Sequence, residues 1–391
     1  MLRFPFLARL AVAGLIVLGA GAAAAQEVVK IGISIPLTGA GFNAVGRQVV
    51  AGARLYVAQH GSMVAGKRIE LIVRDDGGVA DTARRIVQEM IVNDKVHIIG
   101  GGITPTALAI GQLVTQAKIA TVVMVSGASV TVDRSPYMVR TSFTLGQSSA
   151  VIGEWAARNG SKRVVTLVND WAPGVEAETA FVERFTQGGG QIIEKLRVPL
   201  ANPDFAPFLQ RIRDDAPDTA FIYVPGTQAG IFAKQFAERG LDKSGIRIIG
   251  PGDLTDDDEL NGLGDQMIGM VTAHHYSAAH DSAINKAYVE AFKKANNFRP
   301  NFISVGGYDA MHLICEALKK TGGATAGDAL IAAMKGMTWE SPRGPIAIDP
   351  QTRDVVHNIY IRKVEKVGGE LHNVEFATYE AVKDPIKAAK K

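Results

Sequence analysis

The sequence predicts an α/β protein made of two doubly wound parallel-sheet lobes, and three observations support this prediction. Short, β-branched apolar runs alternate with longer amphipathic runs along most of the 391 residues, as in strand–helix repeats. There are about ten such units, which is too many for one small sheet. With 47% hydrophobic and only 7% aromatic residues, the composition suits packed α/β cores better than an all-β sandwich.

The predicted strands are short runs rich in valine and isoleucine. In chain order they are residues 28–35, 68–73, 96–100, 120–125, 163–168, 219–224 and 246–250. Helical patterns lie between and after them, at residues 81–91, 106–117, 150–158, 228–239, 287–295 and 309–320. Asp81 is expected to cap the first of these helices. Gly160, Gly240 and Gly322 are expected to end three of the others, as glycine often does.

The chain changes character after Ser341. A turn-rich segment leads into the alternating run VVHNIYIRKVE (355–365), which predicts a strand, and the glycines after it predict a hairpin turn. The Lys-rich residues 383–391 are expected to form a solvated tail. No low-complexity tract divides the chain, so we expect the lobes to share several crossing strands instead of one flexible linker.

Residues 1–25 have the pattern of a signal peptide. Arg3 and Arg9 precede the apolar run 10–18, and small residues follow up to a cleavage site near Ala25-Gln26. The alternative is a membrane anchor, but the uncharged stretch is shorter than the roughly 20 apolar residues that span a bilayer. Removing the two arginines takes the net charge from +3 to +1. We therefore expect an exported, nearly neutral protein.

Composition and spacing argue against several classes of protein. The near-zero net charge disfavours nucleic acid as a partner. Cys315 is the only cysteine, which rules out an intramolecular disulfide and a cysteine zinc cage, and its apolar helical neighbours predict burial. His274 and His275 would point to opposite faces of a strand, so they do not form a metal site with His280. Without a nucleophile–base pair, we expect no cofactor, no metal and no enzymatic activity.

Neutral hydrogen-bonding groups follow most of the predicted strands. In open α/β sheets, ligands bind at the carboxyl ends of the strands, so these turns are candidate binding segments. They are residues 36–39, 100–106, 126–129, 169–171, 225–227 and 250–255. Because the turns are rich in hydroxyls and glycine and nearly lack cations, they predict a small anion held by neutral donors. Phe42 and Trp171 also lie in turns, either as walls of a ligand pocket or as partly buried core residues.

The turn from Gly100 to Thr106 has the sharpest signal. Its glycines let the backbone approach a ligand, and Pro105 suits a first helical turn. The helix that follows would direct free N–H groups and the positive end of its dipole at an anion, and Thr104 adds a hydroxyl donor. The alternative is an ordinary turn in which Thr104 is a simple N-cap. A dinucleotide site is disfavoured because Pro105 occupies the third glycine position of G-x-G-x-x-G.

Four stretches taken together resemble one family. They are IGISIPLTGA…GRQVVAGARLYV, IELIVRDDGG…ARRIVQEMIVNDKVHIIGG, the SGAS turn and GGYDAMHLICEAL. From about Val28 to Tyr379 the chain is similar to the Leu/Ile/Val-binding-protein-like substrate-binding proteins of branched-chain amino acid ABC transporters. The resemblance implies the type I periplasmic binding protein fold, in which two lobes joined by a three-segment hinge close around a ligand. It also implies a monomer in the periplasm that delivers its ligand to a cognate membrane permease.

The resemblance also implies binding residues, position by position. Thr104, with the helix-end amides, matches a hydroxyl that holds the ligand carboxylate. Ser129, after Gly127-Ala128, matches a second hydroxyl that contacts the carboxylate and ammonium groups. In amino-acid-binding members an acidic residue pairs with the ammonium in a G-P-E-like turn, but here Gly252 stands in that place, with Asp253 one step on. This departure favours a carboxylate with an aromatic or 2-keto body.

We therefore expect an exported solute-binding protein of an ABC importer that closes its lobes around a small carboxylate. The expected lobes are residues 27–146 plus 274–345 and residues 147–273 plus 346–381. The expected ligand-binding residues are Thr104, Pro105, Ser129, Gly127, Ala128, Phe42, Trp171, Thr227 and Asp253. One alternative ligand is a branched-chain or other aliphatic amino acid, with Asp253 as the ammonium partner. An alternative role is a ligand-sensing receptor subunit that takes no part in transport.

Overall fold

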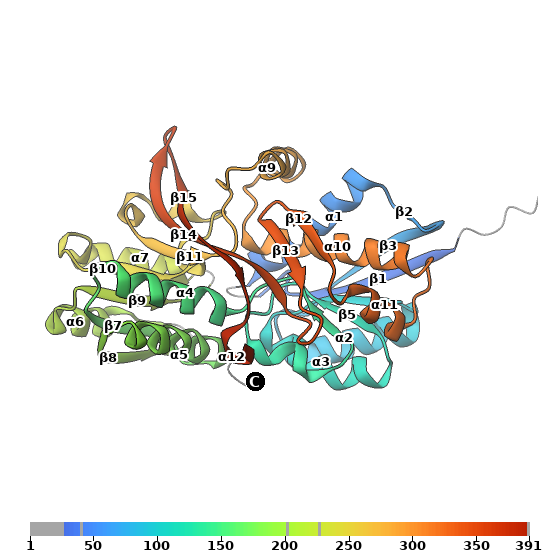
Figure 1. The fold of residues 1–391 in the computed structure, drawn as a ribbon, viewed down its shortest axis with the longest axis horizontal. Helices are drawn as coiled ribbons and strands as arrows, with labels where there is room; N and C mark the ends of the chain where they lie inside the picture. Colours follow the sequence, from blue (N-terminus) through green and yellow to red (C-terminus); the bar gives the residue numbers. More distant parts are fainter. Residues whose placement is uncertain (1–26, 40–41, 201–202, 226–227, 389–391) are drawn as a thin grey trace, which may run out of the picture.

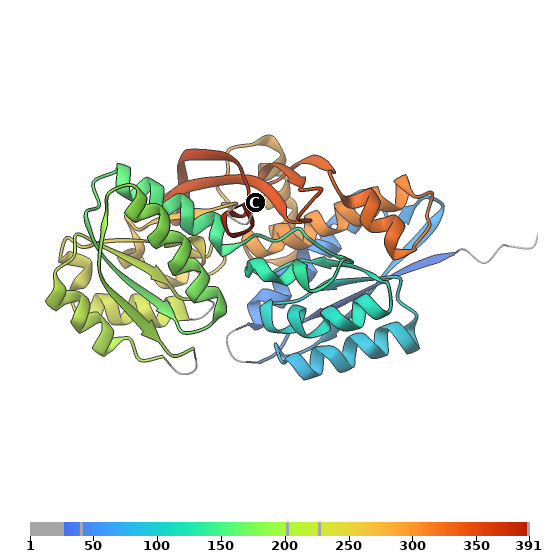
Figure 2. The same ribbon diagram turned by 60° about the horizontal axis from the view of Figure 1, so that its bottom comes forward.

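Two β-sheets organise the chain, one in each of two lobes that lie end to end along the long axis of the molecule (Figures 1 and 2). The computed structural model describes residues 27–39, 42–200, 203–225 and 228–388. The predicted signal peptide (residues 1–25) and Thr227 lie outside the described residues. In the described part of the chain, no helix combines the length and the apolar character that crossing a membrane would require.

The first sheet has six strands in the order β2-β3-β1-β4-β5-β6, and all neighbours are parallel except β2 and β3. The strands are β1 (Val28–Ile35), β2 (Met63–Val64), β3 (Lys67–Asp75), β4 (Ile98–Gly101), β5 (Ala120–Val123) and β6 (Met138–Arg140). Their connecting helices are α1 (Asn43–His60), α2 (Ala80–Glu89) and α3 (Thr104–Gln116). Ile31 and Ile33 of the central strand are fully buried, as expected of a parallel sheet covered on both faces.

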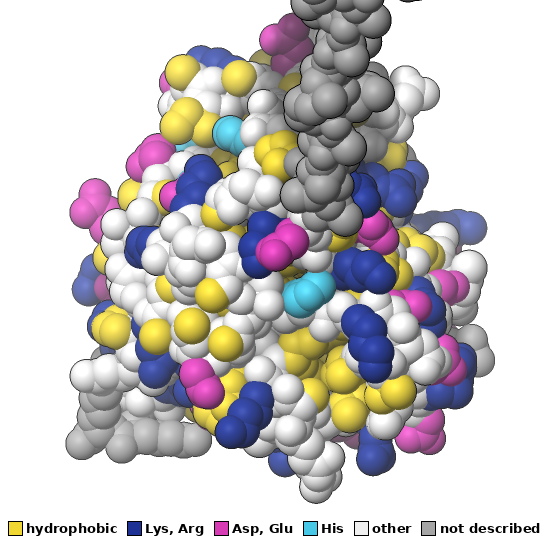
Figure 3. Space-filling model, turned by 90° about the vertical axis from the view of Figure 1, so that its right-hand side faces the viewer, with side chains coloured by type: hydrophobic (Ala, Val, Ile, Leu, Met, Phe, Trp, Pro, Cys, Tyr) yellow, Lys and Arg dark blue, Asp and Glu magenta, His cyan; other side chains and the backbone are white. Residues whose placement is uncertain are grey.

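Three helices from later in the chain return to this lobe. They are α9 (Ala283–Asn296), α10 (Phe302–Lys320) and α11 (Gly327–Met334). Helix α10 packs along α1, and Cys315 within it is buried, as predicted (Figure 1). The outer end of the lobe displays basic and acidic side chains interspersed over its surface (Figure 3).

The second sheet has nine strands, eight in the order β12-β13-β14-β11-β10-β9-β7-β8, with β15 paired to β14. The stretch from β11 to β8 is parallel, and the pairings of β12 to β15 are antiparallel. The strands are β7 (Arg163–Asn169), β8 (Gln191–Val198), β9 (Thr219–Tyr223), β10 (Arg247–Pro251), β11 (Val271–His274), β12 (Thr338–Ser341), β13 (Gly344–Ile348), β14 (Val355–Val367) and β15 (Glu370–Val382). The helices nearby are α4 (Leu145–Arg158), α5 (Ala172–Gln187), α6 (Ala206–Asp215), α7 (Gln228–Glu238), α8 (Leu260–Leu263) and α12 (Pro385–Ala388).

Three segments pass between the lobes. Residues 141–144 join β6 to α4, residues 275–282 join β11 to α9, and the long strand β14 pairs with β13 near its start and with β11 further along. The prediction of two doubly wound lobes with a three-segment connection is confirmed. The residue boundaries of the lobes stay a prediction, because α9 to α11 accompany the first lobe while β12 and β13 are hydrogen-bonded into the second sheet.

The starts of several helices differ from the prediction, and three of these differences have clear local reasons. Helix α4 begins at Leu145 instead of residue 150 because Thr144 and Gln147 form a capping box. Helix α10 begins at Phe302 instead of residue 309 because the Asn301 side chain accepts hydrogen bonds from the first-turn amides. Asp81 does not cap α2, which begins at Ala80, and lies in its first turn, where a negative charge still favours the helix dipole.

Among the described Lys-rich C-terminal residues, Lys383 is exposed, as a solvated tail would be, but Lys387 is not. Lys387 in α12 is only 8% exposed and lies 2.8 Å from Asp133 and 2.6 Å from Asp354. Lys383 pairs with Asp349. The prediction of a solvated tail was wrong for Lys387, because composition alone does not show that carboxylates distant in sequence lie next to this lysine.

Three fully buried arginines lie at the junction of the lobes, and each is paired with a buried carboxylate. The pairs are Arg140–Asp354 (2.8 Å), Arg343–Asp309 (2.7 Å) and Arg362–Asp257 (3.7 Å). Arg343 also donates to the carbonyls of Thr141 and Ser142, and Arg362 donates to the carbonyl of Tyr276. Because an unpaired buried charge costs several kcal/mol, these contacts hold the crossing segments in one arrangement.

We predict that Gly52→Ala destabilises the first lobe by about 1–3 kcal/mol, the usual cost of overpacking a core. A Cβ at Gly52 in α1 would overlap the backbone carbonyl of Ser304 in α10, so the two helices would have to separate. Thermal or urea unfolding measures the change. Gly262→Ala in α8 is the control, since a Cβ there meets nothing within 4 Å. Equal stability of the two variants would contradict the close α1–α10 packing.

Candidate functional site

A cavity lies between the lobes at the carboxyl ends of the parallel strands, and we call it the interlobe cavity. It encloses about 770 Å³ of empty space, part of it open to solvent. Its lining is mostly apolar and aromatic, and no lysine or arginine of the described residues contributes to it. The lining residues are Phe42, Ala44, Val45, Ile103, Thr104, Val125, Ser126, Gly127, Phe143, Leu145, Trp171, Pro173, Tyr223, Pro225, Asp253, Asp256, Glu259, Asn301, Phe302 and Ile303.

The first lobe contributes the turn between β4 and α3. Gly101 and Gly102 have φ of +105° and +80°, a region that glycine adopts without strain. Thr104 is the first residue of α3, and Ile103 occupies the N-cap position without a side-chain cap. The alternative of Thr104 as a simple N-cap is therefore wrong. The first turn of a helix leaves N–H groups without intrahelical acceptors, and Thr104 places its hydroxyl beside them.

A chain of hydroxyl groups supports Thr104. Its Oγ1 lies 2.9 Å from Ser126 Oγ, which in turn lies 2.7 Å from Thr131 Oγ1. If Thr131 donates to Ser126 and Ser126 donates to Thr104, the Thr104 proton is free to point into the cavity. Such aligned hydroxyl groups polarise one another, which strengthens the terminal donor.

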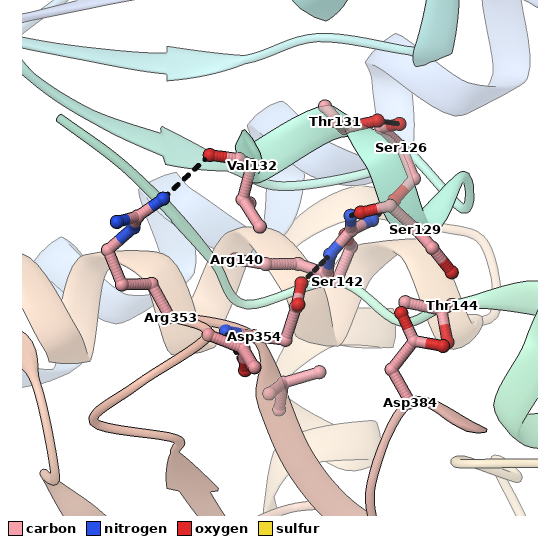
Figure 4. Close-up of polar contacts among 12 residues, drawn as sticks. Ser126, Ser129, Thr131, Val132, Arg140, Ser142, Thr144, Arg353, Asp354 and Asp384 are labelled. Carbon is pink, nitrogen blue, oxygen red and sulfur yellow. Dashed lines mark hydrogen bonds and ion pairs between the residues drawn. The ribbon is translucent and has the colours of Figure 1, made fainter. Parts of the chain in front are cut away.

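Arg140 orients the turn formed by residues 126–129 from behind (Figure 4). Its guanidinium donates to the carbonyls of Ser126 and Ala128, while its Nε donates to Asp354 at 2.8 Å. In a trans peptide unit the C=O and N–H groups point in opposite directions, so the amides of Gly127 and Ser129 are turned away from Arg140. The Gly127 amide has no acceptor within the described part of the chain.

The other amide of this turn already meets a carboxylate, and the carboxylate comes from the second lobe. Ser129 donates from its amide to both carboxylate oxygens of Glu176 in α5, at 3.0 and 3.1 Å, and from its hydroxyl at 2.6 Å. Burial is the largest influence on Glu176 and, opposed by these hydrogen bonds, raises its pKa to about 7. The turn therefore holds a carboxyl group of the other lobe, and this contact bridges the lobes.

Five of the predicted binding residues line the interlobe cavity: Thr104, Gly127, Phe42, Trp171 and Asp253. Pro105, Ala128 and Ser129 do not. Pro105 has no N–H and lies within the first turn of α3, the Ala128 carbonyl is occupied by Arg140, and Ser129 is occupied by Glu176. Direct ligand contact by these three residues stays a prediction.

Aromatic rings from both lobes face each other across the cavity. The Phe42 and Trp171 ring centroids are 6.4 Å apart with the planes tilted by 45°. Both rings line the cavity and also pack against the main hydrophobic core, so each of the two predicted roles is partly correct. Phe143 and Phe302 add an edge-to-face pair with centroids 5.4 Å apart.

The second lobe contributes Asp253, in the turn after β10. Its side chain is 9% exposed and one carboxylate oxygen, Oδ2, has no hydrogen-bond partner among the described residues. Burial raises its pKa to about 7, although Arg362 opposes the shift. A side chain at Gly252, the preceding residue, would collide with Arg362 and His274. Packing therefore excludes an acid at residue 252 and leaves Asp253 as the acid of this turn.

Sequence reasoning missed three aromatic residues of the cavity. Tyr223 is the last residue of β9 and lies inside the predicted strand 219–224. Phe143 lies in a crossing segment, and Phe302 precedes the predicted start of its helix. All three residues lie at or next to the end of a strand or helix. The sequence analysis considered only the turns that follow the strands, so it did not select them. Among the described residues no group of three or more His, Cys, Asp or Glu side chains is placed to hold a metal ion.

Three comparisons relate this chain to known proteins. A family model described as periplasmic binding protein matches residues 28–369. A solute-binding protein of an ABC transporter from Rhodopseudomonas palustris BisB5, solved with 3,4-dihydroxybenzoic acid, is 61% identical, with a TM-score of 0.91 over 93% of this chain and 100% of that chain. One from R. palustris HaA2, solved with p-hydroxybenzoic acid, is 35% identical, with a TM-score of 0.90 over 93% and 100%.

A curated relative has a different description. Leu/Ile/Val-binding protein homolog 6 of Brucella suis biovar 1 is 40% identical over 373 residues, which cover 94% of this chain and 95% of the relative.

We predict that Glu176→Gln weakens the pH dependence of stability. The pKa of Glu176 rises from 4.5 to about 7 on folding. Between these two pH values the folded state therefore binds a proton that the unfolded state does not bind. Stability from this group is complete below about pH 4.5 and is lost as the pH rises through 7. Melting temperatures measured at pH 5 and pH 8 should therefore fall more for the native protein than for Glu176→Gln.

The control is Glu183→Gln, an exposed glutamate on the same helix, which should follow the native profile. Asp253 and the other buried carboxyl groups are common to all three proteins, so the difference between profiles isolates Glu176. Parallel profiles for the native protein and Glu176→Gln would contradict this assignment.

Proposed function

The chain belongs to the periplasmic binding protein family, and we propose that it is an exported solute-binding protein that closes its two lobes around a small aromatic carboxylate. The observation that carries the proposal is a cavity between the lobes with aromatic walls and neutral donors at one end. The benzoic acids held by the two Rhodopseudomonas proteins have the same chemistry, an anionic end on a flat ring. Their similarity to this chain supports the ligand class.

The carboxylate end of the ligand belongs at the first lobe. Because no lysine or arginine of the described residues lines the cavity, the charge must be held by dipoles. The N-terminus of α3 supplies N–H groups and a positive dipole end, and Thr104 and the Gly127 amide add two further donors. Hydrogen bonds to a charged group are roughly twice as strong as neutral ones, so a few neutral donors suffice.

The aromatic ring of the ligand belongs against the Phe42–Trp171 pair, because the two rings, with centroids 6.4 Å apart, already contact each other. These side chains come from different lobes, so the wall that they form is complete only when the lobes are closed. A ligand that contacts both walls binds the closed state better than the open one and shifts the equilibrium toward closure. Closure of this kind is how a binding protein would present an occupied form to a membrane permease.

We further propose that residues 1–25 are removed on export to the periplasm, that the protein acts as a monomer, and that a permease of an ABC importer is its partner. The signal-like N-terminus supports export, and the transporter origin of the similar solved structures supports the permease partner. A sensing role without transport would use the same closure and a different partner.

A second candidate function is binding of an aliphatic amino acid. Three acidic side chains, Asp253, Asp256 and Glu259, line the cavity and could face an ammonium group. The description of the Brucella relative as a Leu/Ile/Val-binding protein homolog agrees with this alternative. Burial raises the pKa of Asp256 well above its usual range, and Asn301 already donates to both of its oxygens. Those two facts make Asp256 a poor ammonium partner.

We predict that 4-hydroxybenzoate and 3,4-dihydroxybenzoate bind to the native protein and that leucine does not, as measured by isothermal titration calorimetry. Thr104→Val should weaken binding of both acids by about tenfold or more, the value of one hydrogen bond to a charged group. Thr115→Val on the same helix is the control, because its hydroxyl bonds to Gly111 and Ser135 away from the cavity. Binding of leucine with no binding of either aromatic acid would replace the proposal with the second candidate.

A further inference from the structure

Two buried polar atoms of residues that line the interlobe cavity lack hydrogen-bond partners, and one is a carboxylate oxygen while the other is an indole nitrogen. Asp253 Oδ2 and Trp171 Nε1 are both inaccessible to solvent and make no hydrogen bond within the described residues. Both residues line the cavity. A buried polar group without a partner costs about 1–3 kcal/mol, so such atoms in a binding cavity indicate what a ligand must supply.

The topology of the second sheet brings these residues to one edge. Asp253 follows β10 and Trp171 follows β7, and β9 lies between those two strands. Tyr223, the last residue of β9, lines the same cavity at this edge. Because the carboxyl ends of parallel strands meet at the same edge, all three side chains form one wall of the cavity.

The chemistry of the two unpartnered atoms is complementary. An indole N–H can only donate a hydrogen bond, and an ionised carboxylate can only accept one. With the ligand carboxylate held at Thr104, an ammonium group at this wall would satisfy Asp253 and leave Trp171 without an acceptor, whereas a carboxylate at this wall would satisfy Trp171 and repel Asp253. A hydroxyl group both donates and accepts, so it satisfies both atoms.

We propose that the Asp253–Trp171 wall is a hydroxyl-recognition subsite that makes the protein select ring-hydroxylated benzoates over unsubstituted benzoate. Asp253 accepts the hydroxyl proton, and Trp171 Nε1 donates to the hydroxyl oxygen, or to a second hydroxyl beside it. This inference rests on the proposed function, because it assumes a carboxylate held at Thr104. Beyond the proposed function, it specifies how the ring is oriented and which residues recognise its substituents.

The surroundings of Asp253 hold its carboxyl group in place without pairing it with a cation. Arg362, which is fully buried, donates to the carbonyl of Gly252 and to the hydroxyls of Thr255 and Thr272. It thereby fixes the turn that presents Asp253 without pairing directly with the carboxylate, and its own ion-pair partner is Asp257. Burial moves the pKa of Asp253 to about 7, so the carboxyl group benefits from a neutral hydrogen-bonding partner as well as from a cationic one.

Calorimetric titration of benzoate, 4-hydroxybenzoate and 3,4-dihydroxybenzoate tests the subsite. The quantity compared is the ratio of the benzoate Kd to the hydroxybenzoate Kd, and we expect it to be about ten or more for the native protein. Asp253→Leu keeps a side chain of similar size without an acceptor, and Trp171→Phe keeps an aromatic wall without the N–H. Each substitution should reduce the ratio about tenfold, toward one. Glu183→Gln, an exposed carboxylate in α5, the helix that follows Trp171, should keep the native ratio.

The outcomes separate this inference from the function on which it rests. If the native protein binds no benzoate of any kind, the proposed function fails and the subsite fails with it. If the native protein binds all three acids equally, or if both cavity variants keep the native ratio, the subsite is wrong while the proposed function stands. Melting temperatures confirm that each variant is folded, and Trp171→Phe alone decides the question if Asp253→Leu does not fold.

Discussion

The interlobe cavity depends on one buried interaction, the contact of Arg140 with Asp354 and with the turn at residues 126–129. The guanidinium and the carboxylate are 0% and 2% exposed, so each would be strongly unfavourable without the other. Arg140 lies at the end of β6, and Asp354 lies at the start of β14, 214 residues later. The pair therefore joins two of the crossing segments. The carbonyls that complete the guanidinium's hydrogen bonds orient the amides of the 126–129 turn away from it, on the side of the cavity and of α5.

The two lobes line the cavity with polar groups of different kinds. The first lobe presents hydroxyls, amides and a helix N-terminus, and the second presents carboxyl groups, an indole N–H and a tyrosine hydroxyl. A ligand with an anion at one end and a hydrogen-bonding ring substituent at the other satisfies both walls. In the Glu176–Ser129 contact, likewise, a carboxyl group of the second lobe accepts hydrogen bonds from neutral donors of the first. The raised pKa of Glu176 shows that its carboxyl group loses much of its hydration when it makes this contact.

Local pattern was enough to predict the lobes and part of the site. The strands and the Gly100–Thr106 turn could be predicted because β-branched runs, glycine and a helix start are properties of neighbouring residues. Glu176 and Arg140 could not, since their partners lie 47 and 214 residues away in the sequence. Tyr223, Phe143 and Phe302 were missed because an aromatic residue at the end of a strand or helix has the same local pattern whether it faces a core or a cavity. The glycine at residue 252 was noticed, but its cause, the packing of Arg362 and His274, is visible only in three dimensions.

The orientation of an aromatic acid in the interlobe cavity is the central claim, and a crystal structure of the mature protein with 3,4-dihydroxybenzoate tests it most directly. The account predicts the carboxylate at Thr104 and the N-terminus of α3, the ring against Phe42 and Trp171, and the hydroxyls within hydrogen-bond distance of Asp253. Density for the ligand in the opposite orientation, with its carboxylate against the second lobe, or outside the cavity altogether, would contradict it.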